Sequence, residues 1–346
     1  MTSYQFPDGA TMHSLVAIRR YEEALGIPIF HSLKQLHMTY IAGKTIFSSV
    51  PSIVEDLSYS YNILRNEQPL EKGLRLFNLG YLDECISLLK TVTEKQRTFD
   101  VCKALGIALF RKGDYVHAFP YLKYFAENEV NKKIFYYLGL CLEELGDKTD
   151  ALLWLKKASS LGEEEAFFDT GRLFVENADY SAAVVFLRKS IRFEQKKDTF
   201  FLLGVACYYT AQYEEGLHYL QELTELDPAL EYYHWYARTL IKLNKIDEAL
   251  PIFRSLVNMR GDSGDFHWYG KTLLQNDQKT EALTYLRKAL ETRGNATDYL
   301  WYGICLYQSG MYAESVKYLT SSQKMGAGDV CSQWLNLAME KIIKRI

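Results

Sequence analysis

The amino-acid sequence predicts an all-α protein, an α-solenoid of about eight helical hairpins with a helical cap at each end. Three observations predict this fold. A small residue recurs every 32 or 33 residues, a second small residue follows each of them by twelve positions, and apolar residues fall at helical spacing on both sides of a short break. One such hairpin cannot bury both of its apolar faces, so we expect the hairpins to stack along the chain.

The recurring small residue, which we call the anchor, is glycine at seven of its eight positions. The anchors are Gly73, Gly106, Gly139, Gly171, Gly204, Ala237, Gly270 and Gly303. The small residues twelve positions later are Cys85, Ala118, Ala151, Ala183, Gly216, Ala249, Ala282 and Ser315. Small side chains let two helix backbones approach closely, so we expect each pair to mark the contact inside one hairpin.

Large apolar side chains keep the same phase. They stand three and sixteen residues after each anchor, as Leu142 and Leu155 do after Gly139. In the same repeat, Gly146-Asp147 interrupts the helical spacing and predicts the turn between the two helices. We expect the large side chains to fill the space between successive layers of hairpins.

The two ends of the chain do not belong to the eight repeats, which span residues 66–329. In residues 1–65, the stretches 12–25 and 52–64 are predicted to be helices, with Pro28 and Pro51 as breaks. This segment is either a cap on the first hairpin, or a docking arm or segment that folds into the binding groove. Residues 330–346 predict one more helix, with Trp334, Leu337 and Ile342 available to cover the last layer.

Two repeats carry a family resemblance. Phe135-Tyr-Tyr-Leu-Gly139 is followed by Ala151 and Ala158, and Phe266-His-Trp-Tyr-Gly270 is followed by Ala282 and Ala289. This pattern resembles the tetratricopeptide repeat (TPR) family over roughly residues 66–329. The resemblance implies a right-handed superhelix whose first helices line a concave groove. The period of 33 in place of 34, and a closing proline found only at Pro228, depart from the family pattern.

Composition and charge exclude several classes of protein. The formal net charge is -3, from 40 Lys+Arg against 43 Asp+Glu, so no overall field attracts nucleic acid. The first ten residues lack the basic and apolar pattern of a secretory signal, and no apolar run of about 18 residues predicts a membrane span. The six cysteines form no CxxC pair, which favours free thiols and the cytoplasm.

Motifs for catalysis, metals and cofactors are missing. Ala42-Gly43-Lys44-Thr45 resembles the end of a phosphate loop, but Met38 stands where that motif needs glycine. His234-Trp-Tyr and His267-Trp-Tyr repeat on neighbouring hairpins. Equivalent residues on neighbouring helices are on the order of 10 Å apart, too far to share one metal ion, so we interpret the pair as repeat duplication. We therefore expect no catalytic residues, no metal and no cofactor.

The resemblance implies that residues three before and one, four and five after each anchor face the groove. Arg172, Arg238 and Lys271 share the position one after the anchor and are the strongest candidates for partner contacts. The further candidates are Lys242, His234, His267, Tyr208, Tyr209 and Tyr136. Aromatic and basic residues of this kind anchor protein interfaces, so we expect a partner segment with apolar anchors and acidic flanks.

The sequence thus predicts a non-catalytic scaffold or adaptor that holds partner segments within a multiprotein assembly. Two alternatives stay open, a secretion or assembly chaperone that shields an apolar client segment, and a regulator that responds to a peptide. Some family members grip a C-terminal carboxylate with Lys and Asn, but here Ile107 follows Lys103 where the Asn would stand, which disfavours that partner. The partner, the oligomeric state and the choice between groove and convex face are not predicted.

Overall fold

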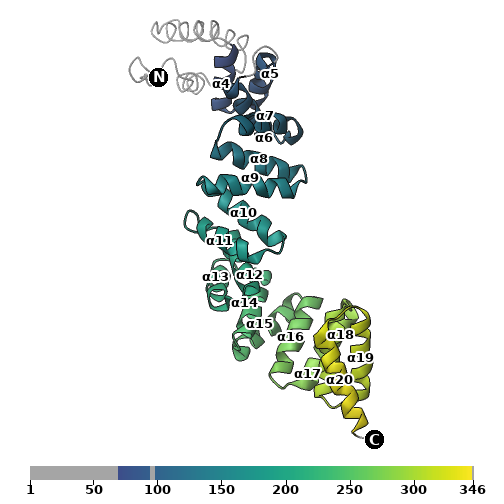
Figure 1. The fold of residues 1–346 in the computed structure, drawn as a ribbon. Helices are drawn as coiled ribbons and strands as arrows, with labels where there is room; N and C mark the ends of the chain where they lie inside the picture. Colours follow the sequence, from purple (N-terminus) through teal and green to yellow (C-terminus); the bar gives the residue numbers. More distant parts are fainter. Residues whose placement is uncertain (1–68, 94–97, 345–346) are drawn as a thin grey trace, which may run out of the picture. The chain divides into compact units, whose positions relative to one another are not determined.

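The computed structural model describes residues 69–93 and 98–344 (Figure 1). In these residues the chain is all-α, with seventeen helices. The helices are α4 (Pro69–Leu79), α5 (Leu82–Thr93), α6 (Phe99–Arg111), α7 (Tyr115–Asn128), α8 (Lys132–Glu144), α9 (Lys148–Ser160), α10 (Glu164–Glu176), α11 (Tyr180–Ser190), α12 (Lys197–Tyr209), α13 (Tyr213–Leu226), α14 (Leu230–Lys242), α15 (Ile246–Met259), α16 (Ser263–Gln275), α17 (Lys279–Thr292), α18 (Ala296–Gln308), α19 (Tyr312–Lys324) and α20 (Asp329–Ile343).

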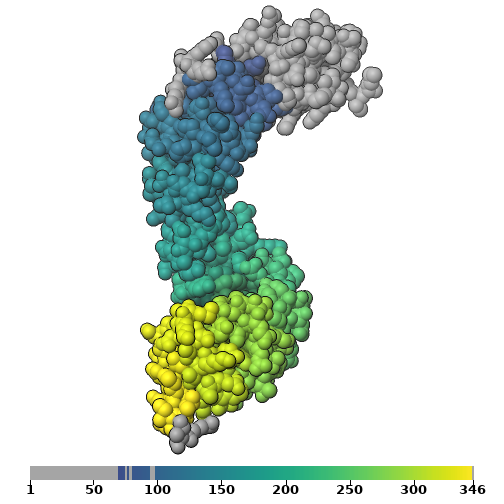
Figure 2. All heavy atoms as spheres, turned by 90° about the vertical axis from the view of Figure 1, so that its right-hand side faces the viewer, coloured from purple at the N-terminus to yellow at the C-terminus, as the bar shows by residue number. Residues whose placement is uncertain are grey.

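The helices α4 to α19 pair as eight sequential hairpins, and each anchor lies on the first helix of its pair. This confirms the predicted array of TPR-like hairpins. The chain divides into two compact units, residues 1–166 and 167–346, which we call unit 1 and unit 2 and describe separately. Within each unit the colours in Figure 2 follow the sequence without mixing, because hairpins contact the hairpins next to them in the chain.

The anchor glycines sit where the two helices of a hairpin touch. A Cβ added at Gly139 would lie 2.6 Å from Cγ of Leu155 and 3.2 Å from the carbonyl oxygen of Ala151. This confirms the predicted close contact between the small residues. It also corrects the position of the side chain sixteen residues after the anchor, which we expected between layers. At the seven glycine anchors that side chain packs on the anchor inside its own hairpin, in the space that a Cβ would occupy.

Every turn inside a hairpin uses one residue with positive φ, seven positions after the anchor. In four turns it is glycine, as at Gly146 with φ of 88°. In the other four it is Ala178, Ala211, Asn244 or Asp277, with φ between 57° and 59°. The left-handed conformation ends the first helix and reverses the chain, so the repeat fixes this backbone shape even where glycine is absent.

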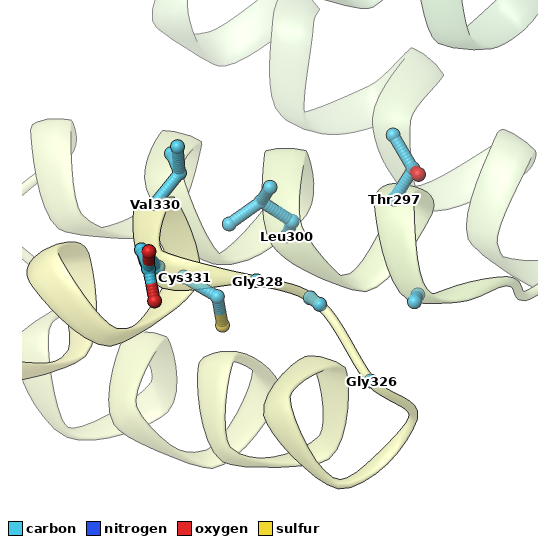
Figure 3. Close-up of a pocket in the computed structure, with 9 residues that line it drawn as sticks. Thr297, Leu300, Gly326, Gly328, Val330 and Cys331 are labelled. Carbon is cyan, nitrogen blue, oxygen red and sulfur yellow. The ribbon is translucent and has the colours of Figure 1, made fainter.

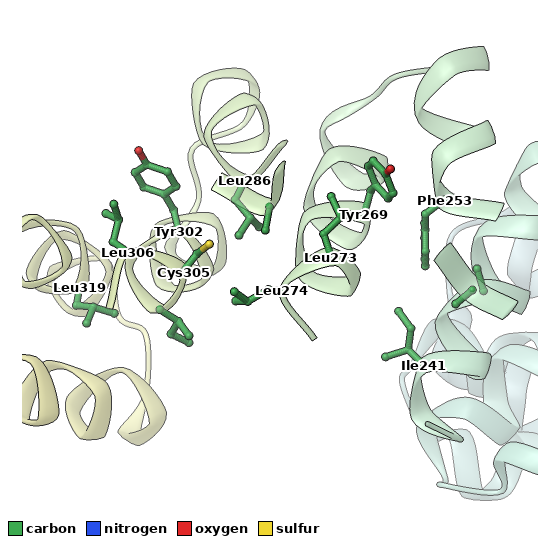
Figure 4. Packing of buried hydrophobic residues seen from close by; sticks show 14 of the residues in the cluster. Ile241, Phe253, Tyr269, Leu273, Leu274, Leu286, Tyr302, Cys305, Leu306 and Leu319 are labelled. Carbon is green, nitrogen blue, oxygen red and sulfur yellow. The ribbon is translucent and has the colours of Figure 1, made fainter. Parts of the chain in front are cut away.

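The core of the second half of unit 2 is one continuous cluster of buried side chains (Figure 4). Phe253, Leu286 and Leu319, each sixteen residues after its anchor, belong to it. Tyr269 and Tyr302 are almost fully buried, and each hydroxyl accepts a hydrogen bond from an arginine on the preceding helix. Phe253 is the aromatic member of its series and packs beside Ala237, the one anchor that carries a Cβ.

The predicted helices at 12–25 and 52–64 lie outside the described residues. At the other end, α20 confirms one more helix after the eight hairpins. It buries Cys331, Leu335 and Ala338, and the Trp334 ring lies 5.3 Å from the Tyr307 ring. Leu337, which we expected to cover the last layer, is 42% exposed because it lies on the opposite side of the helix from Leu335.

The six cysteines are buried free thiols. Burial raises the pKa of the Cys85 and Cys141 thiols to about 11, and that of the Cys207 and Cys305 thiols to about 12. These thiols therefore behave as small core side chains rather than nucleophiles. None of the described helices combines the length and the apolar character that crossing a bilayer requires.

Candidate partner-binding face

In unit 2, the first helices of four consecutive hairpins bring together aromatic and basic side chains. We call this set the cationic–aromatic face. It consists of Tyr208 on α12, Trp235, Arg238 and Lys242 on α14, Trp268 and Lys271 on α16, and Trp301 on α18. The repeat produces it, because the three tryptophans each stand two residues before an anchor, and Arg238 and Lys271 each stand one residue after.

Arg238 is enclosed by rings rather than by carboxylates. Its guanidinium carbon lies 3.8 Å from the centroid of the Trp235 ring and 4.5 Å from that of Trp268. The Tyr208 ring centroid is 4.8 Å away. The rings attract the cation through their π faces. Its Nε is nevertheless buried and has no hydrogen-bond partner among the described residues, which leaves one strong donor unused.

Lys271 lies between two tryptophans of neighbouring hairpins. Its Nζ is 4.5 Å from the Trp268 ring centroid and 4.3 Å from that of Trp301. Burial, together with the positive charges of Lys242 and Arg238, lowers the pKa of Lys271 to about 8. Within the described part of the chain, none of these three cations has a carboxylate partner. Three positive charges thus gather without compensation on one surface.

Arg172 differs from the other two residues at its repeat position. It lies on α10 and forms ion pairs with Asp169 at 3.3 Å and Glu176 at 2.8 Å, three residues before it and four after. The two carboxylates on its own helix balance its charge. The shared repeat position therefore does not give Arg172 the unpaired charge of Arg238 and Lys271.

The two repeated histidines take part in buried hydrogen-bond networks between hairpins. Nδ1 of His267 on α16 lies 2.8 Å from Asp298 on α18, and Arg293 donates two hydrogen bonds to the same carboxylate. His234, Asp265 and Arg260 form the same arrangement one repeat earlier, with 3.0 Å between Nδ1 and the carboxylate. Among the described residues, no group of three or more His, Cys, Asp or Glu side chains is placed to hold a metal ion.

Burial and hydrogen bonding set the charge state of these networks. Burial acts to raise the pKa of Asp298, but the hydrogen bonds from Arg293 and His267 outweigh it and hold the pKa at about 2. Burial lowers the pKa of His267 despite the neighbouring carboxylate. A neutral His267 therefore donates its Nδ1–H to an ionised Asp298. This joins two hairpins and leaves the histidine little exposed to a partner.

The next junction along the chain lacks the network. One repeat later, Leu300, Cys331 and Gly326 stand at the positions of the histidine, the aspartate and the arginine. A pocket of about 570 Å³ lies there, and Figure 3 shows these three residues in its lining together with Thr297 and Val330. Gly326 contributes no side chain to this space, where the two preceding repeats have an arginine.

The three candidate tyrosines differ in their surroundings, although the rings of Tyr208 and Tyr209 lie 5.4 Å apart and that of Tyr209 lies 5.8 Å from Trp235. Tyr208 is buried and contacts Arg238, as described above. Tyr209 is 48% exposed, and its ring stacks on Tyr180 at 4.2 Å between centroids. Tyr136 lies in unit 1 on α8, half-buried, with its ring 5.8 Å from that of Tyr137. Of the three, Tyr208 belongs to the cationic–aromatic face.

The tryptophans are the residues that sequence reasoning missed. We interpreted the Trp residues of the repeated His-Trp-Tyr motif as core between layers, and Trp301 was not a candidate. In the structure they are half-buried and support Arg238 and Lys271 with their ring faces. The signal was present as tryptophan at one repeat position in three successive hairpins, with a basic residue three positions after the first two of these tryptophans.

Comparison with known proteins agrees with this architecture. The tetratricopeptide repeat family model matches residues 103–163, and a second tetratricopeptide repeat model matches residues 230–263 and 266–295. The stretches 103–163, 230–263 and 266–295 are thus tetratricopeptide repeats. Such repeats are generally protein–protein interaction modules, and proteins built from them are typically non-catalytic. A search of the curated proteins found no match.

Solved structures with similar folds are tetratricopeptide repeat proteins too. The C-terminal part of a TPR repeat-containing protein from Cytophaga hutchinsonii is 17% identical, covering 65% of this chain and 95% of that one, with a TM-score of 0.46. YrrB, described as a TPR protein with an unusual peptide-binding site, is 23% identical over 54% of this chain and 96% of its own, also with a TM-score of 0.46. A chain of the APC/C hetero-tetramer Cut9–Hcn1 is 12% identical, covering 82% of this chain and 59% of that one, with a TM-score of 0.50.

Proposed function

We propose that this protein is a scaffold or adaptor that holds an acidic segment of a partner protein on the cationic–aromatic face of unit 2. The observation that carries the proposal is the group of three cations, Arg238, Lys242 and Lys271, that has aromatic neighbours but no carboxylate partner in the described residues. The six free thiols support a reducing compartment, and we place the binding in the cytoplasm.

An incoming carboxylate would supply what this surface lacks. It would pair with the guanidinium of Arg238, whose charge no described carboxylate balances, and hydrogen bonds between charged groups are roughly twice as strong as neutral ones. It would also relieve the repulsion between Lys271 and its two cationic neighbours, which lowers the pKa of Lys271. Trp235, Trp268 and Trp301 add apolar ring surface, which favours apolar side chains beside the acidic ones.

The test is titration of the full chain with a peptide of six glutamates and two leucines, followed by tryptophan fluorescence, because three of the five tryptophans lie on this face. Arg238→Glu combined with Lys271→Glu is expected to weaken binding at least tenfold and to release partners that the wild-type chain retains from its native source. Lys288→Glu, a single charge reversal on α17 of the same hairpin as Lys271, is the control outside the face and should bind normally.

Helicity measured by circular dichroism shows whether each variant is folded. Equal affinity for the peptide in the folded double variant and the wild-type chain would exclude this face as the binding surface. If Lys288→Glu lost as much affinity for the peptide as the double variant, the net charge of the chain would explain the loss. That result would also count against the proposal.

A further inference from the structure

Unit 1 contains a pocket of about 500 Å³ with an unusual charge balance. It lies among α4, α6 and the start of α8, and four of its nine lining residues are basic while none is acidic. The basic residues are Lys103, Arg111, Lys132 and Lys133. Phe77 and Tyr137 contribute aromatic rings to the wall.

One of the four basic side chains already has an ion-pair partner and a hydrogen-bond partner in its surroundings. Nζ of Lys132 lies 3.4 Å from the Glu163 carboxylate and donates a hydrogen bond to the carbonyl of Gly162. This contact ties α8 to the end of the following helix. Lys132 is therefore a structural member of the wall rather than a free charge.

The other three cations have no carboxylate partner in the part of the chain that the structure describes. The Arg111 guanidinium carbon lies 5.3 Å from the centroid of the Phe77 ring, and Nζ of Lys103 lies 5.9 Å from that of Phe125. Lys133 is an exposed residue in the first turn of α8. Aromatic contacts orient the first two cations but do not neutralise them.

The repeat places this pocket on the same side of its hairpins as the face in unit 2. Arg111 stands five residues after its anchor, as Lys242 does, and Lys103 stands three residues before the same anchor. Unit 1 therefore presents unpaired cations at the repeat positions where partner contacts were expected. Our sequence analysis named Tyr136 as a candidate in this unit but not Arg111 or Lys133.

We infer that the pocket of Lys103, Arg111 and Lys133 is a second anion-binding site, which takes a glutamate or aspartate side chain of a protein segment. The inference rests on the proposed function, in that the ligand is again a partner protein, but the site lies in the other unit. Phe77, Ile107 and Tyr137 give apolar wall area for the aliphatic stem of the acidic side chain. The bidentate fork of Arg111 fits a carboxylate head.

A nucleic acid fits the pocket less well than a protein segment. Recognition of a nucleic-acid backbone needs basic residues along many phosphates. The affinity of non-specific binding grows with the number of phosphates that the protein neutralises. Here three cations line one open pocket, and the chain as a whole is net negative. The geometry thus favours one acidic side chain.

The test uses the full chain and a fluorescein-labelled peptide of six glutamates, with binding followed by fluorescence anisotropy and calorimetric stoichiometry. We expect two classes of site. Arg111→Gln combined with Lys133→Gln should remove one class, and Arg238→Gln combined with Lys271→Gln should remove the other. Lys123→Gln, which removes one charge from an exposed lysine on α7 outside the pocket, is the control and should remove neither class.

The charge-retaining pair Arg111→Lys with Lys133→Arg should keep the site, which distinguishes charge from loss of structure. If Arg111→Gln with Lys133→Gln leaves binding unchanged while the unit 2 pair loses it, the second site does not exist and the proposed function stands. If the unit 1 pair loses binding and the unit 2 pair does not, the second site is supported and the proposed face fails. Tighter pocket-dependent binding of a labelled thymidine hexanucleotide than of the peptide would overturn the choice of a protein ligand.

Discussion

One residue in each turn determines how much backbone strain the reversal of the chain costs. Non-glycine residues in the left-handed region carry a steric cost of about 1–2 kcal/mol, which asparagine and aspartate partly escape. Ala178 and Ala211 bear this cost in unit 2, with φ of 57° and 59°. Glycine at the equivalent Gly146, in unit 1, avoids it.

We therefore predict opposite effects for matched substitutions at this position. Gly146→Ala should lower the free energy of unfolding by about 1 kcal/mol, since nothing but backbone strain changes in the open space around it. Ala178→Gly should raise the midpoint of thermal unfolding, because relief of strain exceeds the added entropy of the unfolded chain. Circular dichroism melting of the full chain checks both, and a lower midpoint for Ala178→Gly would contradict the argument.

These positions also show what local sequence can predict. Gly146 marked its turn because glycine interrupts helical spacing, whereas Ala178 carries no turn signal of its own and is held there by the packing of its hairpin. The neutralisation of Arg172 was predictable from Asp169 and Glu176 at helical spacing. The unpaired state of Arg238 was not, because it depends on which residues the neighbouring hairpins place nearby.

The two helices of a hairpin are held together by the contact between the anchor and the side chain sixteen residues later. A methyl group added at Gly139 would come within 2.6 Å of Leu155, closer than carbon atoms approach in real structures. We predict that Gly139→Ala lowers the free energy of unfolding by about 1–3 kcal/mol through overpacking. Denaturant titration measures it, and Gly139→Ala with Leu155→Ala should recover part of the strain energy relative to Leu155→Ala alone. If Gly139→Ala left the free energy of unfolding unchanged, the two helices would be able to move apart without loss of stability.

The junction between α16 and α18 gives unit 2 an acid-sensitive element. Burial lowers the pKa of His267 in the folded protein below the value of 6.5 that the histidine has in the unfolded chain. The folded state therefore has its full stability above pH 6.5, and loses stability as pH falls below 6.5 because the unfolded chain takes up the proton first. The pKa of Asp298 is held at about 2, so its contribution is present above its unfolded value of 3.8 and is lost as pH falls toward 2. Both groups weaken the junction on the acid side.

We predict that the melting temperature of the full chain falls between pH 7 and pH 5, and that His267→Gln flattens this dependence. Asp298→Asn should lower the free energy of unfolding at pH 7 by about 1–3 kcal/mol, because the amide removes the negative charge and places an NH2 donor where Oδ2 accepts from Nε of Arg293. Hydrogen exchange of amides in α17 and α18 locates the effect. The junction of α18 with α20, where Leu300 and Cys331 replace the network, serves as the internal control and should not respond to pH in this range.

For the molecule as a whole, the fold was predictable because eight repeats agree, so an error in one repeat is corrected by the others. The candidate site was predictable only in part. The phase of the repeat identified Arg238 and Lys271. Whether such a cation is neutralised depends on the side chains that neighbouring hairpins place beside it, which the sequence does not show. A net charge near zero also gives no information on where unpaired cations gather. The small net charge of -3 therefore describes the average of the chain and not its binding surfaces.

This distribution of charge makes partner binding sensitive to alkaline pH. The pKa of Lys271 is about 8, because of burial and the nearby charges of Lys242 and Arg238, so its positive charge is lost as pH rises through that value. Glutamate side chains stay ionised over the same range. We predict that the affinity of unit 2 for the acidic peptide falls by about tenfold between pH 7 and pH 9, one decade for the loss of one required proton. Tryptophan fluorescence titration measures it.

Lys271→Arg is the decisive comparison, because a guanidinium keeps its charge at pH 9. The variant should bind the peptide with nearly constant affinity from pH 7 to pH 9, while Arg238→Gln should bind more weakly but retain the pH dependence, now shifted upward because one of the charges that lowers the pKa of Lys271 is gone. A wild-type affinity that does not change with pH would mean that the peptide does not contact Lys271.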